Sequence, residues 1–165
     1  MYKKEQLEKY PYLAKELENN GINQMLDPLT GILSRGFIIG FAQSLIAEGT
    51  PFTYAIIDLD NFKFINDTYG HHVGDEVLVS VAEGLVDFLE GYGIAGRFGG
   101  DELLIIDVRD FTYQEKKDFL RRLYSQGTVL RKNVVLEDCS PFITGTVGCA
   151  TFPDDAQAYN ELFAL

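Results

Sequence analysis

Apolar residues at three- and four-residue spacings mark the first segment of the chain as helical. The recurring set is Leu7, Tyr10, Leu13 and Leu17. This spacing is typical of an amphipathic helix. Pro11 should kink or split the helix, because proline lacks an amide hydrogen and its ring clashes with the preceding turn. Asn19-Asn20-Gly21 is a stop signal. We predict an N-terminal helical linker over residues 1–26, either a packing helix or the end of a signalling helix descending from an upstream sensor domain.

The pattern that follows alternates between helix and strand. Turn residues 27–31 precede an apolar helical pattern that includes Phe37 and Ile46. A nearly continuous β-prone run, Phe52–Leu59, predicts a buried central strand. Residues 61–67 follow this strand, and we expect a loop over residues 69–74 after them.

A long helix should follow this loop, with apolar residues along one face. These are Val77, Leu78, Val81, Leu85, Phe88 and Leu89. We place Asp75 and Glu76 in its first turn, where the helix dipole favours negative charge. Helix capping by Asp75 is one reading of that position.

The second half of the chain predicts a hairpin, a helix and a final strand. Residues 94–98 and 103–108 are strand-like and flank Gly99-Gly100-Asp101-Glu102, a tight turn. A helix over residues 113–124 and a strand over Phe142–Phe152 complete the order. This order favours an α/β (α+β) fold in which helices flank a central, mixed but mostly antiparallel sheet.

Composition narrows the function classes. The 165 residues are 46% hydrophobic, which suits one domain with a core, and 25 Asp and Glu outnumber 14 Lys and Arg. This acidity argues against nucleic acid as a partner but suits a site that recruits divalent cations. Cys139 and Cys149 form no zinc pattern and are expected to be small buried hydrophobes. No apolar run approaches the roughly 20 residues of a spanning helix, so we predict a cytoplasmic protein.

Two acidic clusters carry the candidate chemistry. Asp58 and Asp60 are two apart at a strand end, so both carboxylates should project from one face. In the hairpin, Gly99 and Gly100 allow a bulky ligand close to the backbone, next to Asp101 and Glu102. Taken alone, the first cluster is also compatible with a solvated strand end, and the second with a purely structural turn. Together they form the layout by which palm-type nucleotide enzymes hold a metal-bridged triphosphate.

Four segments resemble the signatures of GGDEF domains, the bacterial diguanylate cyclase module, in family order. DPLTGILSR at 27–35 is similar to DxLTGLxNR, DLDNFKFINDTYGHHVGDEVL at 58–78 to DxDxFKxxNDxxGHxxGDxxL, RFGGDEL at 97–103 to RYGGDEF, and GTVGCATFP at 145–153 to the late SxGxAxxP strand. The resemblance implies a palm-like nucleotide-cyclase fold and assigns residues 27–165 to a GGDEF domain with a truncated C-terminal segment.

The resemblance also implies a reaction. Two GTP molecules, one on each protomer of a homodimer, would condense into cyclic di-GMP and pyrophosphate. Asp58, the Leu59 carbonyl and Asp101 would hold Mg²⁺ (or Mn²⁺). Either Asp101 or Glu102 would help to deprotonate the 3′-hydroxyl, and Lys63 would stabilise phosphate charge.

Further residues are implied in substrate binding. Phe62 and Lys63 would offer backbone amides to the nucleotide, while Asn66 and Asp75 would recognise guanine. A carboxylate accepts hydrogen bonds from guanine N1–H and the 2-amino group, neither of which adenine has. ATP should therefore be rejected.

The sequence departs from the family pattern in two places. Product-inhibited members carry RxxD upstream of the hairpin, where this chain has Glu90-Gly91-Tyr92-Gly93, so we expect the product-inhibition site to be absent. The chain stops where family members continue into a helix that supplies a Lys and an Arg for the phosphates. The alternative to a cyclase is therefore a catalytically weak or inactive GGDEF domain that acts as a GTP-binding or protein-interaction module, within a larger signalling protein.

Overall fold

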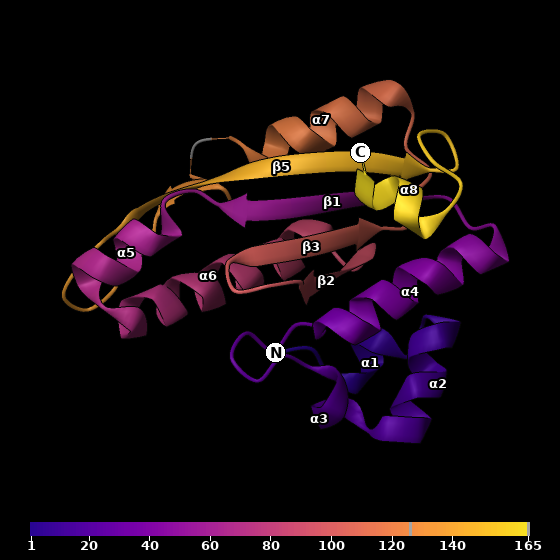
Figure 1. Ribbon diagram of the computed structural model, residues 1–165, viewed down its shortest axis with the longest axis horizontal. Helices are drawn as coiled ribbons and strands as arrows, with labels where there is room; N and C mark the ends of the chain where they lie inside the picture. Colours follow the sequence, from indigo (N-terminus) through magenta and orange to yellow (C-terminus); the bar gives the residue numbers. More distant parts are fainter. Residues whose placement is uncertain (126, 165) are drawn as a thin grey trace.

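A five-stranded antiparallel sheet forms the centre of the molecule. The computed structural model describes residues 1–125 and 127–164. The strands are β1 (Phe52–Leu59), β2 (Gly93–Arg97), β3 (Glu102–Asp107), β4 (Arg131–Asn133) and β5 (Phe142–Phe152). Their order across the sheet is β2-β3-β1-β5-β4, and every adjacent pair is antiparallel (Figure 1). The predicted α/β class and central strand are confirmed, while the hairpin strands each begin one residue earlier than predicted.

Helices surround this sheet. They are α1 (Lys4–Leu7), α2 (Pro11–Asn20), α3 (Ile22–Met25), α4 (Arg35–Glu48), α5 (Phe62–Tyr69), α6 (His71–Leu89), α7 (Tyr113–Leu123) and α8 (Tyr159–Ala164). Figure 1 shows α7 beside β5, and α1–α3 grouped against α4 on the other side of the molecule. None of the described helices is long and apolar enough to cross a membrane.

The N-terminal segment is broken where its sequence predicts. Pro11 occupies the first turn of α2, where its missing amide is tolerated, and Gly21 ends that helix with a φ of 78°. The side chains of the predicted apolar stripe are all buried; they are Leu7, Tyr10, Leu13 and Leu17. The division between a linker over residues 1–26 and a domain from residue 27 stays a prediction.

Polar contacts also tie this segment to the rest of the chain. The Tyr2 amide donates to the Gly31 carbonyl (2.9 Å), and the Ala95 amide of edge strand β2 donates to the buried Tyr2 hydroxyl (2.7 Å). The Tyr10 hydroxyl donates to the Gly91 carbonyl at 3.3 Å. The first residues therefore close part of the exposed edge of β2.

The prediction of a loop over residues 69–74 is wrong. Only Gly70 interrupts the helices, with a φ of 93°, and α6 begins at His71. Histidine and glycine in this stretch suggested a loop, but residues 71–74 are helical and Gly74 lies close against Asn66 of α5. Asp75 therefore lies beyond the first turn of α6, which contains no acidic residue. Capping of α6 by Asp75 is excluded.

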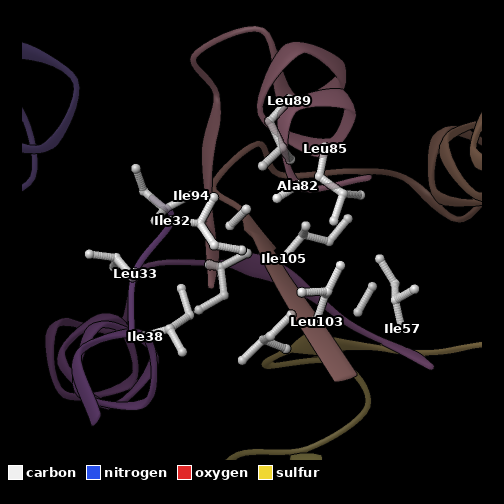
Figure 2. Close-up of a cluster of buried hydrophobic side chains, with 14 of the residues drawn as sticks. Ile32, Leu33, Ile38, Ile57, Ala82, Leu85, Leu89, Ile94, Leu103 and Ile105 are labelled. Carbon is white, nitrogen blue, oxygen red and sulfur yellow. The ribbon is translucent and has the colours of Figure 1, made fainter. Parts of the chain in front are cut away.

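Aliphatic side chains fill the space between the sheet and the helices. Figure 2 shows Ile57, Leu103 and Ile105 of the sheet gathered with Ala82, Leu85 and Leu89 of α6 and Ile38 of α4. Because α6 and β3 share this core, the position of each strand end depends on helix packing. The two cysteines are only half-buried rather than core residues, since Cys149 packs against the core from its margin.

Candidate functional site

The two acidic clusters meet at one end of the sheet. In the register of β1 and β3, Asp58 lies opposite Glu102. One residue further on, the Leu59 amide donates to the Asp101 carbonyl at 3.2 Å, and the Asp101 side chain is a hydrogen-bonding neighbour of Asp58. The structure thus brings together Asp58, Leu59, Asp101 and Glu102, as the sequence predicted.

The hairpin tip is short and closed. The amides of Phe98 and Gly99 both donate to the Glu102 carbonyl, at 2.8 and 3.2 Å. Glu102 is already the first residue of β3, so only Asp101 belongs to the tip itself. The two acids are therefore held by different elements, one by the turn and one by the sheet.

Arg97 organises this tip from beneath. Its Nη2 donates to the Gly100 carbonyl at 2.8 Å, and its Nε lies 3.2 Å from the Gly99 carbonyl. The same guanidinium forms an ion pair with Asp27 (3.3 Å), in the turn before α4. A planar guanidinium has donors enough to serve a carboxylate and two carbonyls at once.

Asp27 is itself tightly held. Its Oδ2 accepts from the Thr30 amide (2.9 Å) and the Thr30 hydroxyl (2.8 Å). Burial by itself would raise the pKa of Asp27, but the Thr30 hydrogen bonds and the Arg97 charge outweigh it and lower the pKa. Sequence reasoning quoted both motifs without assigning Asp27 or Arg97 a role, because their contact joins segments 70 residues apart.

Negative charge is concentrated around Asp58. Partial burial, and then the charges of Asp101, Glu102 and Asp60, raise the pKa of the Asp58 carboxyl. Carboxylates gathered in this way favour a bound cation, because a cation offsets their mutual repulsion.

The donor set fits a hard divalent metal ion. The neighbouring carboxylates of Asp58 and Asp101 supply oxygen, the ligand atom that Mg²⁺ and Mn²⁺ prefer. Among the described residues no group of three or more His, Cys, Asp or Glu side chains could hold a metal ion. Water or a bound polyphosphate would therefore have to complete the coordination, as is usual for Mg²⁺.

A cleft of about 380 Å³ opens beside the hairpin tip. Its lining combines α5, the start of α6 and the hairpin, and includes Phe62, Lys63, Asn66, Asp75, Arg97 and Asp101. Every substrate-binding residue predicted from the sequence lies in this lining. Lys63 is exposed and makes no ion pair within the described part of the chain, so its charge is available to an anion.

Asn66 and Asp75 reach the cleft from neighbouring helices. A Cβ atom placed on Gly74 would lie 1.8 Å from Asn66 Oδ1 and 3.3 Å from the Phe62 ring. Glycine is therefore required for the Asn66 side chain to sit against α6, next to Asp75. Sequence reasoning missed this role, although the glycine directly before Asp75 was the available signal.

The histidines take no part in the acidic cluster. His71 is exposed at the start of α6 and lines the same cleft, while the His72 side chain is 89% exposed and lies 3.9 Å from Glu76.

Comparisons with known proteins agree with this geometry. A family model for the diguanylate cyclase GGDEF domain matches residues 24–165. Diguanylate cyclase DosC of Escherichia coli K12 is 41% identical over 85 residues, which cover 49% of this chain and 18% of DosC. Response regulator PleD of Caulobacter vibrioides is 36% identical over 99 residues, covering 58% of this chain and 22% of PleD. The chain thus spans about a fifth of the length of these relatives.

Solved structures show the same fold over most of the chain. A sensory box/GGDEF family protein from Caulobacter crescentus superposes with a TM-score of 0.75 at 28% identity, over 85% of this chain and 91% of that one. Diguanylate cyclase SiaD from Pseudomonas aeruginosa gives a TM-score of 0.73 at 26% identity, over 95% and 62% of the two chains. In sequence and in fold, this chain belongs to the GGDEF domain family.

Proposed function

We propose that this domain is a diguanylate cyclase, a nucleotidyltransferase that condenses two GTP into cyclic di-GMP with release of pyrophosphate. The observation that carries the proposal is the convergence of Asp101, Lys63, Asn66 and Asp75 on one cleft. A GGDEF domain that retained only an interaction surface would not need all four side chains in one place.

Asp58, the Leu59 carbonyl and Asp101 would hold the metal ion, Mg²⁺ or Mn²⁺. When bound, such an ion neutralises phosphate charge and orients the triphosphate. The raised pKa of Asp58 agrees with a site in which carboxylate repulsion is relieved by a cation.

The triphosphate would lie against the start of α5. Phe62 and Lys63 are the first two residues of this helix, and the first amides of an α-helix have no acceptor within it. These amides and the Lys63 ammonium would therefore face the phosphate oxygens. Fixed donors of this kind stabilise charge that develops during phosphoryl transfer.

Guanine would be read by Asn66 and Asp75. An ionised Asp75 only accepts hydrogen bonds, so it pairs with the N1–H and 2-amino donors of guanine. Adenine would leave this carboxylate unpaired, and sites with an unpaired buried polar group discriminate strongly.

Chemistry requires two copies of this half-site in a homodimer. Each 3′-oxygen would form a bond to the α-phosphorus of the facing GTP, while the bond between the α- and β-phosphates breaks and pyrophosphate leaves. The 3′-hydroxyl proton would pass to Asp101 or Glu102. Since turnover depends on bringing the two half-sites together, a sensor upstream of residues 1–26 would control the rate.

The test is incubation of the full-length protein that contains this domain with Mg²⁺ and GTP, followed by separation of the products. We expect cyclic di-GMP and pyrophosphate from the unmodified protein and none from Asp101→Ala, which should stay folded. Asp110→Ala is the matched control, because Asp110 is an exposed acid outside the cleft. Binding of GTP without product would instead identify a regulatory GTP-binding module.

A further inference from the structure

The two carboxylates of Asp58-Leu59-Asp60 have different surroundings. Asp58 faces the hairpin acids, whereas both oxygens of Asp60 accept hydrogen bonds from β5. Thr144 Oγ1 donates to Asp60 Oδ2 at 2.8 Å, and Thr146 Oγ1 donates to Asp60 Oδ1 at 2.7 Å. The spacing predicted that both carboxylates project from one face, but the tertiary contacts give them different partners.

The backbone of Asp60 is held by the same strand. Its amide donates to the Thr144 carbonyl at 2.9 Å. The regular ladder between β1 and β5 ends at the pair Leu59 and Gly145. Asp60 therefore extends the attachment to β5 by one residue, into the turn that leads to α5.

This turn contains a strained residue. Asn61 has a φ of 55°, one of two positive values among the described residues other than glycine. Such a conformation persists where surrounding contacts fix it. Asn61 connects the clamped Asp60 directly to Phe62 and Lys63, the first residues of α5.

The three hydrogen bonds thus determine where α5 begins. Charge-assisted hydrogen bonds are stronger and more directional than neutral ones, and here two converge on one carboxylate. If they are lost, the turn is anchored only by β1 behind it and α5 ahead of it. The amides of Phe62 and Lys63 would then be displaced relative to the acids of the hairpin.

We propose that Asp60 is a positioning residue, clamped by Thr144 and Thr146 of β5, that fixes the turn presenting Phe62 and Lys63 to the nucleotide phosphates. The inference rests on the nucleotide site proposed above. It gives the second acid of the motif a role distinct from metal binding. It also gives two threonines of β5 a role in fixing an acid that lies 84 and 86 residues before them in the chain.

The experiment uses Thr144→Val and Thr146→Val, singly and together, in the full-length protein. Valine keeps the shape of threonine and removes only the hydroxyl. Thr144→Ser and Thr146→Ser keep the hydroxyl and should restore parental behaviour. Thr53→Val is the matched control on the neighbouring strand β1, because the Thr53 hydroxyl is buried and has no hydrogen-bond partner among the described residues.

The first measurement is amide hydrogen exchange without nucleotide. We expect the Asp60 amide to exchange about tenfold faster in the double valine variant, by the loss of charge-assisted hydrogen bonds, and Thr53→Val to match the parent. Unchanged exchange at Asp60 would overturn the clamp. This outcome is read without activity, so it is distinct from failure of the cyclase proposal.

The second measurement is binding of a non-hydrolysable GTP analogue with Mg²⁺, alongside binding of Mn²⁺ alone. The double valine variant should bind the analogue about tenfold more weakly, as expected for a lost charged hydrogen bond, with Mn²⁺ affinity unchanged. Serine variants that bind as weakly as the valine variants would contradict the proposal. So would an Asp60→Asn variant that loses Mn²⁺ binding, because Asp60 would then be a metal ligand.

Discussion

Arg97 and Asp27 join the turn before α4 to the hairpin that carries Asp101, through an ion pair of 3.3 Å. The same guanidinium donates to the carbonyls of Gly99 and Gly100. The hairpin tip is therefore held through its backbone by Arg97, which also lines the cleft beside Asp101. Two segments that are separate motifs in the sequence therefore hold the hairpin tip together.

Arg97→Ala should remove this support. We expect a loss of about 1–3 kcal/mol in the free energy of unfolding, since it leaves Asp27 and two carbonyls without a charged donor. Cyclase activity should fall at least about tenfold. Urea unfolding and product formation measure the two effects. Arg121→Ala is the control, because its ion pair with Asp118 is exposed and worth about 0.5 kcal/mol or less.

The lowered pKa of Asp27 should make the free energy of unfolding depend on pH. Its pKa is lowered in the folded state, so its contribution is present above the unfolded value of about 3.9 and is lost as the pH falls through the lower folded value. Asp27→Asn should be less stable than the parent at pH 7, and the difference should shrink below about pH 4. Urea unfolding at both pH values measures this, and a difference independent of pH would contradict it.

Gly74→Ala should weaken GTP binding without unfolding the protein. The new methyl group would lie 1.8 Å from Asn66 Oδ1, so the Asn66 side chain must leave its place beside Asp75. We expect about a tenfold loss of affinity, equivalent to a lost hydrogen bond of about 1.4 kcal/mol. Calorimetric titration with a GTP analogue checks this.

Gly36→Ala is the matched control for that substitution. Gly36 lies in α4, and no described heavy atom comes within 4 Å of its added methyl group. The helix should gain about 0.5–1 kcal/mol, and GTP affinity should stay the same. Equal affinities for the two alanine variants would argue against a role of Asn66 in binding.

Asp75→Asn should relax nucleotide choice. The amide offers a donor where guanine presents N1–H and the 2-amino group, so GTP binding should fall by about a hundredfold relative to ATP. Competition between the two nucleotides measures the ratio. Glu76→Gln, at an adjacent acid that is absent from the cleft lining, should leave it unchanged.

Cyclic di-GMP should not inhibit cyclase activity by binding to the segment before the hairpin. The positions for the charged anchors are Glu90 and Gly93, and the Lys9 ammonium donates to the Gly91 carbonyl between them at 2.6 Å. Activity should be insensitive to added product at concentrations that saturate an inhibitory site. Tight binding of cyclic di-GMP to this domain in a titration would refute the prediction.

Local signals in the sequence determined the secondary elements. The uninterrupted run Phe52–Leu59 became β1 with those bounds, because a strand buried on both faces needs no polar alternation. Pro11 and Gly21 divided the N-terminal helices, because proline restricts the backbone and glycine permits the positive φ that ends α2. The acids of the site could be listed for the same reason, since motif and spacing are properties of short segments.

Tertiary structure alone decided how those residues are used. Helix α6 starts at His71 and includes Gly74, against local propensity, and Gly74 is where the helix packs closely against Asn66 of α5. Asp27 meets Arg97, and Asp60 meets Thr144, across long stretches of chain. Such pairings depend on strand register and helix packing, which are set by the whole core. The sequence by itself determined which groups are present, and the fold determined which of them face the cleft and which hold it in place.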